Sequence, residues 1–177
     1  MENTKQAVLI VASNGFQDKE FEDTQKVLQE KDINTIVSST ENIAKGKLGK
    51  VLEVDVLLKD LDVSNYSAIV FIGGPGATDY KNNETALQIA QKARQENKIL
   101  GAICIAPVIL AKASILQGKN ATVWSNETNK EAIDFLKENG ANFIDKPIVI
   151  DGNIITGNGP GAAYQFGLSL ADNILNN

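Results

Sequence analysis

Cys104 is the side chain best suited to nucleophilic chemistry, and it is the only cysteine among the 177 residues. It separates a strand-like apolar run, residues 99–103, from a helix-like apolar run, residues 105–111. This pattern predicts a nucleophile elbow, a sharp strand-to-helix turn that holds the side chain above a sheet. N–H groups at the start of the following helix would favour the thiolate, so we expect a pKa well below the usual value of about 8.5. The alternative is a small buried side chain, since free cysteine is often buried.

The chain contains no histidine. This excludes Ser-His-Asp and Cys-His catalysis within the chain. A structural zinc site would need several Cys or His ligands, so we expect no metal. We expect no other cofactor either. Proton transfer must then fall to carboxylates, the thiol itself, tyrosine, lysine or water.

Glu20 is the carboxylate of greatest interest, in a predicted helix over residues 18–30. Acidic residues near a helix N-terminus usually form a solvated face, a role that Asp18 and Glu22 can fill. Glu20 points elsewhere on the helical wheel from Glu22. If Glu20 is buried beside a thiolate, its pKa is raised and it can donate a hydrogen bond to the sulfur.

Two glycine-rich segments could suggest nucleotide binding. Gly73-Gly74-Pro75-Gly76 lacks the Gly-Lys-Ser/Thr of a P-loop, and Asp79 stands where the third glycine of the dinucleotide fingerprint would be. A tight turn whose N–H groups approach the Cys104 sulfur, as half of an oxyanion hole, is favoured over a phosphate loop. The second segment, residues 157–161, also has the wrong spacing and is interpreted as a loop in which Pro160 enters a helix.

Composition narrows the class of protein. Hydrophobic residues make up 43% and charged residues 22% of the chain, as in soluble globular proteins, and the length predicts one domain, residues 1–177. A net charge of -5 without a Lys/Arg cluster argues against a nucleic-acid partner. The apolar stretches are too short to span a bilayer, and the polar start has no signal-peptide character. One cysteine cannot form an internal disulfide, so we expect a cytoplasmic protein.

Apolar strands alternate with amphipathic helices along the chain, which predicts an α/β sandwich around a mainly parallel sheet. Ligands in such folds sit at the carboxyl ends of the strands. The turns after Ala12, Ile72 and Ile103 should therefore share one edge and bring Glu20 and Cys104 together. The predicted strands are residues 7–12, 33–37, 67–72, 99–103 and 121–124, with hairpins in 45–56 and 148–156, and the main helices are residues 18–30, 84–96, 130–139 and 160–173.

Four motifs together resemble the ThiJ/PfpI superfamily of DJ-one-like and PfpI-like proteins, almost from end to end. The resemblance implies a flavodoxin-like three-layer sandwich. It also implies a homodimer, as is common in that superfamily. It also implies that Cys104 is the nucleophile, Glu20 its protonated partner, and the N–H groups of Gly74 and Ile105 the oxyanion donors. The motifs are Ala12-Ser13-Asn14-Gly15-Phe16 with Glu20, Ile72-Gly73-Gly74-Pro75-Gly76, Ala102-Ile103-Cys104-Ile105-Ala106-Pro107 and Thr156-Gly157-Asn158-Gly159-Pro160-Gly161.

The chain departs from the superfamily pattern where histidine is expected. PfpI-type members carry histidine directly after the cysteine, and this chain has Ile105 there. Members related to DJ-one often carry another histidine after the next strand, where we assign Ser125 or Asn126. Asn126 could only orient substrate or water. Peptidase activity is therefore not expected, and the glyoxalase chemistry of the superfamily loses one proton shuttle.

We predict a Cys-Glu enzyme that acts on small reactive carbonyl compounds or their adducts, like a glyoxalase or deglycase. Its activity should be weak because histidine is absent. Two alternatives remain open at this point. The protein could be a redox-sensing or stress-protective protein whose cysteine is oxidised to a sulfinate, with an oxidant as its small-molecule partner. It could also be a stable scaffold in which Cys104 is vestigial.

Overall fold

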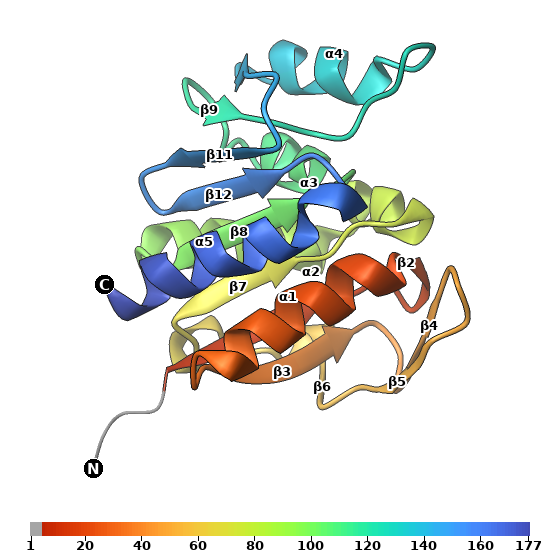
Figure 1. Ribbon diagram of the computed structural model, residues 1–177, viewed down its shortest axis with the longest axis vertical. Coiled ribbons are helices and arrows are strands. Elements are labelled where there is room, and N and C mark those ends of the chain that lie inside the picture. The colour runs from red at the N-terminus through yellow and green to blue at the C-terminus, as the bar shows by residue number, and fades with distance from the viewer. Residues whose placement is uncertain (1–4) are drawn as a thin grey trace.

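A seven-stranded sheet forms the centre of the computed structural model, which describes residues 5–177 (Figure 1). The strand order is β11-β12-β8-β7-β1-β3-β6, and only the β11–β12 pair is antiparallel. The predicted mainly parallel sheet is therefore confirmed. Its strands are β1 (Gln6–Ile10), β3 (Asn34–Ser39), β6 (Val56–Leu57), β7 (Ala68–Phe71), β8 (Ile99–Ile103), β11 (Ile148–Asp151) and β12 (Ile154–Gly157).

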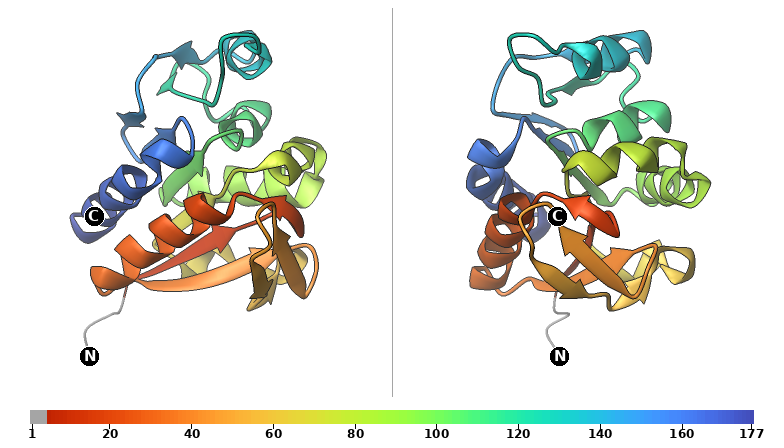
Figure 2. Two further views of the ribbon diagram at one scale, coloured as in Figure 1. Left: turned by 45° about the vertical axis from the view of Figure 1, so that its right-hand side comes forward. Right: turned by 90° about the vertical axis from the view of Figure 1, so that its right-hand side faces the viewer.

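Helices cover both faces of this sheet (Figure 2). On one face, α1 (Asp18–Glu30) packs beside α5 (Ala163–Leu175). On the other face lie α2 (Glu84–Gln95) and α3 (Pro107–Lys112), and α4 (Glu131–Glu138) packs against α3. The fold is the flavodoxin-like three-layer sandwich that the sequence predicts. Within residues 5–177, no helix is both long and apolar enough to cross a membrane.

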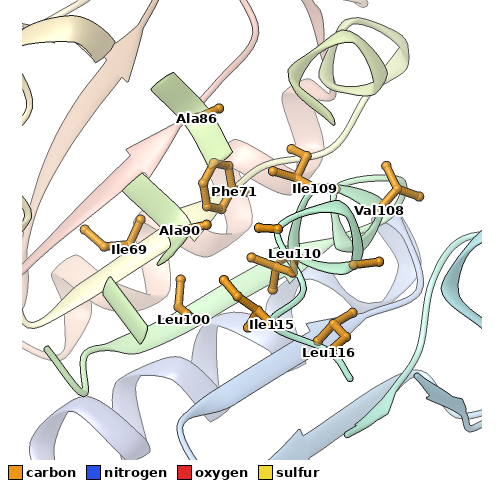
Figure 3. Packing of buried hydrophobic residues seen from close by; sticks show 14 of the residues in the cluster. Ile69, Phe71, Ala86, Ala90, Leu100, Val108, Ile109, Leu110, Ile115 and Leu116 are labelled. Carbon is orange, nitrogen blue, oxygen red and sulfur yellow. The ribbon is translucent and has the colours of Figure 1, made fainter. Parts of the chain in front are cut away.

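Burial of both sheet faces explains why the central strands read as continuous apolar runs. Along β7, Val70 faces the core under α1 and α5, whereas Ile69 and Phe71 face the core under α2 and α3. Figure 3 shows Phe71 beside Ala86 and Ala90 of α2, whose small side chains leave room for the aromatic ring. Two apolar cores, one on each face, thus hold the carboxyl ends of the strands in place.

The register of the central strands aligns their carboxyl ends. Phe71 of β7 pairs with Ile10 of β1 on one side and with Ala102 of β8 on the other. The three segments that follow these strands therefore leave the sheet at the same edge. This arrangement confirms the predicted convergence of the turns after Ala12, Ile72 and Ile103.

Several short elements differ from the predictions. The strand expected at residues 121–124 is only β9 (Asn120–Ala121), and it pairs with β10 (Asn142–Phe143) outside the main sheet. The expected hairpin in 45–56 is β4 (Ile43–Gly46) with β5 (Val51–Glu53), and β2 (Asn14–Phe16) joins it as a third strand. Such short segments show no clear periodicity in a sequence. The same holds for the 3-10 helices η1 (Leu58–Asp60), η2 (Val63–Asn65), η3 (Pro75–Asn82) and η4 (Pro160–Ala162).

The longer elements agree with the predictions. The bounds of α1 are those predicted, and its apolar side chains Phe21, Val27 and Leu28 are all buried. Gln17 caps this helix, with its side-chain oxygen accepting a hydrogen bond from the N–H of Lys19 at 3.2 Å. Pro160 begins η4, which leads directly into α5, as interpreted for the 157–161 loop.

We expect the core between α5 and the sheet to dominate stability on that face. Leu170 is fully buried, whereas Leu175 in the same helix is 50% exposed. Leu170→Ala should lower the free energy of unfolding by about 2–5 kcal/mol, because it removes apolar contacts and leaves a cavity. Leu175→Ala is the matched control and should change it by less than about 1 kcal/mol. Urea denaturation measures both values, and equal losses would contradict the packing described.

Candidate active site

Cys104 lies at a sharp turn between β8 and α3. Its φ of +63° places it in the left-handed region, which is uncommon for residues other than glycine and costs free energy. Two backbone hydrogen bonds hold it there. The Cys104 N–H donates to the Gly157 carbonyl at 2.9 Å, and the Cys104 carbonyl accepts from the Trp124 N–H at 2.8 Å. The predicted strand-turn-helix geometry is present, with the strained residue at the cysteine.

Glu20 of α1 reaches this turn and is fully buried. Its Oε2 accepts a hydrogen bond from the Gly73 N–H at 3.0 Å. Its Oε1 is buried and has no hydrogen-bond partner of its own among residues 5–177. The thiol of Cys104 interacts directly with this carboxyl group. An incompletely hydrogen-bonded carboxylate is costly to bury, so the site favours the protonated acid.

The pKa of Glu20 reflects this environment. Burial raises it from 4.5 to about 7, against the opposing effects of the Cys104 thiol, the Gly73 N–H and the positive charge of Lys47. The prediction that a buried Glu20 has a raised pKa is therefore confirmed. The neighbouring Glu22 is exposed and forms an ion pair with Lys50 at 2.8 Å, which is the solvated role expected for it.

The predicted low pKa of Cys104 is wrong. Burial and the negative charge of an ionised Glu20 raise the pKa of the thiol, although hydrogen bonds from the Gly74 and Ile105 N–H groups lower it in part. The helix invoked for the thiolate begins only at Pro107 and has six residues. An ionised Glu20 opposes ionisation of the Cys104 thiol, whereas the hydrogen bond from the thiol favours ionisation of Glu20, so the two groups titrate as a coupled pair in which Glu20 is the stronger acid.

Gly73 and Gly74 allow three segments to meet. A Cβ on Gly73 would lie 2.5 Å from both the Cys104 Cβ and the Glu20 Oε2, so no larger residue fits between them. Gly74 has a φ of +112°, and this conformation turns its N–H toward the sulfur. The structure thus places all four of Cys104, Glu20, Gly74 and Ile105 together, as the sequence predicts.

A pocket of about 440 Å³ opens in front of Cys104. Asn126, expected to orient substrate, is not among the residues that line it. Its Oδ1 accepts hydrogen bonds from the Thr128 N–H and hydroxyl and from the Asn129 N–H, so the side chain stabilises its own loop. Side chains that do line the pocket with Cys104 are Gln17, Lys47, Thr78, Trp124, Asn129 and Glu131.

Trp124 is one of several lining residues that sequence reasoning missed. It belongs to the stretch in which a second histidine was sought, and its N–H donates to the Cys104 carbonyl. This bond places residue 124, rather than 125 or 126, at the wall of the pocket. The signal available in the sequence was a lone tryptophan at the end of an apolar run, which equally suits a core residue.

The raised pKa of Glu20 predicts a pH-dependent stability. The unfolded state ionises near pH 4.5 and the folded state near pH 7, so the stabilising contribution is complete below pH 4.5 and is lost as the pH rises through 7. Wild type should lose about 3 kcal/mol of unfolding free energy over this window through Glu20. Glu20→Gln should abolish that loss, and Glu22→Gln should preserve it. Urea denaturation across the window measures the three proteins, and identical pH profiles would contradict the burial of an ionisable Glu20.

Comparisons with known proteins agree with this fold. The DJ-1/PfpI family model matches residues 5–173. An uncharacterised protein of Methanocaldococcus jannaschii is 36% identical over 96% of this chain and 83% of its own length. A deglycase of Thermococcus kodakarensis is 32% identical over 90% of this chain and 93% of its own length.

Among solved structures, a ThiJ/PfpI domain protein of Brachyspira murdochii superposes with a TM-score of 0.93 at 28% identity, covering 98% of both chains. Drosophila melanogaster DJ-1beta superposes with a TM-score of 0.84 at 27% identity, covering 97% of this chain and 90% of its own. The chain belongs to the DJ-1/PfpI family.

Proposed function

We propose that this protein is a Cys-Glu enzyme that converts small reactive carbonyl compounds, or releases them from their adducts. One observation carries the proposal. The Cys104 sulfur lies between a buried carboxyl group, Glu20, and two backbone N–H donors, Gly74 and Ile105, at the wall of an open pocket. Relatives named as deglycases support the same chemistry.

In the first step the Cys104 thiol transfers its proton to ionised Glu20 as the sulfur becomes the nucleophile. The sulfur attacks the aldehyde carbon, a C–S bond forms, and the electrons of the carbonyl π bond move to oxygen. N–H groups at the site stabilise the developing negative charge, as in an oxyanion hole. Glu20 delivers the proton to this oxygen, and the product is a neutral hemithioacetal with Glu20 ionised.

The second step needs Glu20 as a base. For a 2-oxoaldehyde such as methylglyoxal, the ionised Glu20 removes the proton from the carbon bonded to sulfur and returns it to the neighbouring carbon through an enediol. This gives a thioester of the 2-hydroxy acid, which water hydrolyses to lactate and the free thiol. The overall reaction adds one water and needs no external oxidant. A group with a pKa of about 7 suits both roles at neutral pH.

Oxidation of Cys104 is the second candidate, favoured by the position of the sulfur at an open pocket. Peroxide would convert the thiolate to a sulfenate and water, and a second equivalent would give the sulfinate. The same N–H groups and a protonated Glu20 would stabilise the added oxygens. Such oxidation adds mass to the protein, whereas catalytic turnover leaves the protein unchanged.

We expect slow formation of lactate from methylglyoxal that depends on Cys104. Cys104→Ser removes the nucleophile and should reduce the rate to that of the solution reaction. Glu20→Gln should reduce it by about 10²–10⁴-fold, the usual effect of one acid-base group. Glu22→Gln is the control and should retain the wild-type rate. Wild type that makes no more lactate than Cys104→Ser would overturn the proposal, and added oxygen in the intact mass after peroxide treatment would then favour the redox function.

The lining of the pocket also predicts where a histidine would help. Trp124→His puts an imidazole on the pocket wall and should raise the rate of lactate formation by about 10-fold or more, since it adds a proton shuttle. Asn126→His adds the same group in an exposed loop that does not line the pocket, and should leave the rate unchanged. Steady-state assays compare the two variants, and a larger gain from Asn126→His would contradict this assignment of the pocket wall.

A further inference from the structure

Lys47 brings the only positive charge to the residues that line the Cys104 pocket. It lies in the turn between β4 and β5, while Glu131, the only exposed carboxylate of the lining, begins α4. In Figure 1 the β4–β5 hairpin is at the lower right and α4 at the top, so the two elements that carry these charges lie well apart. An anionic substrate would meet attraction on the hairpin side and repulsion on the α4 side.

The turn that carries Lys47 is tightly held by Asp18. The Asp18 Oδ2 accepts the Leu48 N–H and its Oδ1 accepts the Lys50 N–H, both at 2.8 Å. A Cβ on Gly46 would lie 2.5 Å from the Asp18 Cγ, so glycine is needed for this close approach. The Lys47 N–H itself donates to the Phe16 carbonyl at 2.7 Å. Lys47 is therefore positioned at the pocket by the same helix, α1, that carries Glu20.

None of the ion pairs found within residues 5–177 involves the ammonium group of Lys47, although Lys50 in the same hairpin pairs with Glu22. The charge of Lys47 nevertheless reaches the interior of the site, because it lowers the pKa of Glu20 against the larger effect of burial. An unpaired cation at the mouth of a reactive site attracts anions.

We propose that Lys47 binds the carboxylate of compounds in which a carboxylate adjoins the reacting carbonyl, the 2-oxo acid class, and so favours their reversible addition to Cys104. This inference rests on the proposed addition of Cys104 to a carbonyl carbon. With the carboxylate bound at Lys47, the carbonyl carbon one bond away faces the sulfur. The reverse orientation would bring the carboxylate toward the negative charge of Glu131 and is disfavoured. Addition forms the C–S bond, breaks the carbonyl π bond and places the proton of the pair on oxygen.

Alkylation of Cys104 tests the anion preference without any need for turnover. Iodoacetate and iodoacetamide have the same shape and both lose iodide to the sulfur, but only iodoacetate is negatively charged. Cys104 is the only cysteine, so the mass of the intact protein reports its modification alone. The ratio of the two rates cancels changes in the pKa of the thiol. In Lys47→Gln this ratio should fall about 3–10-fold, the effect of one nearby charge in a solvated site.

Three controls separate specific binding from general electrostatics. Lys45→Gln removes an exposed lysine of the same hairpin that does not line the pocket, and should leave the ratio unchanged. Lys47→Arg keeps the charge and should keep the ratio. Added salt should lower the ratio in wild type and not in Lys47→Gln. An unchanged ratio in Lys47→Gln, or an equal fall in Lys45→Gln, would overturn the proposal.

Glyoxylate extends the test to a carbonyl compound of the proposed class. It should protect Cys104 from iodoacetamide in wild type, and Lys47→Gln should need about 3–10-fold more glyoxylate for equal protection. Protection by glyoxal, which has no carboxylate, should be the same in both proteins. Equal protection by glyoxylate would overturn the proposal. Absence of lactate formation would overturn the proposed function while leaving the alkylation ratio intact, so the two failures are distinguishable.

Discussion

The buried carboxyl group of Glu20 is the interaction on which the site depends. It has no exposed surface and accepts one backbone hydrogen bond, from Gly73. Its position beside Cys104 requires a glycine at 73, because the space for a Cβ is filled by the two reacting side chains. Burial also raises its pKa to about 7. A chain without histidine thus acquires a group that can give and take a proton at neutral pH.

Helix α1 carries a second buried carboxyl group, Asp18. Its pKa is lowered, whereas that of Glu20 is raised. Asp18 is 5% exposed, and burial alone would raise its pKa, but the N–H groups of Leu48 and Lys50 lower the pKa by more. Asp18 therefore stays ionised and holds the turn that bears Lys47. Two residues later, Glu20 receives only one backbone N–H, and burial raises its pKa to about 7. The number of N–H donors decides the role of each carboxyl group.

The fold and the centre of the site were predictable because both depend on strong sequence signals. Buried parallel strands read as apolar runs, α1 has a clear apolar face, and the glycines and Cys104 mark the strand ends. The wall of the pocket was not predictable in the same way. Asn126 and Trp124 differ in their contacts, with Asn126 bonded to its own loop and Trp124 tied to the Cys104 carbonyl. Only the tertiary structure shows which of them faces the sulfur.

The pKa of Cys104 was mispredicted for a related reason. A helix start after a cysteine indicates a low pKa only if that helix is long and the sulfur is not beside another acid. Here α3 has six residues, and Glu20 adds a negative charge whenever it ionises. In the proposed mechanism the sulfur is therefore activated through transfer of its proton to Glu20 rather than through permanent ionisation. Such a pair can serve addition to an aldehyde, where one group alternates between acid and base. Cleavage of an amide is more demanding, because the amide carbonyl is the weaker electrophile and the leaving amine must be protonated. We therefore expect carbonyl addition rather than peptide hydrolysis from this pair.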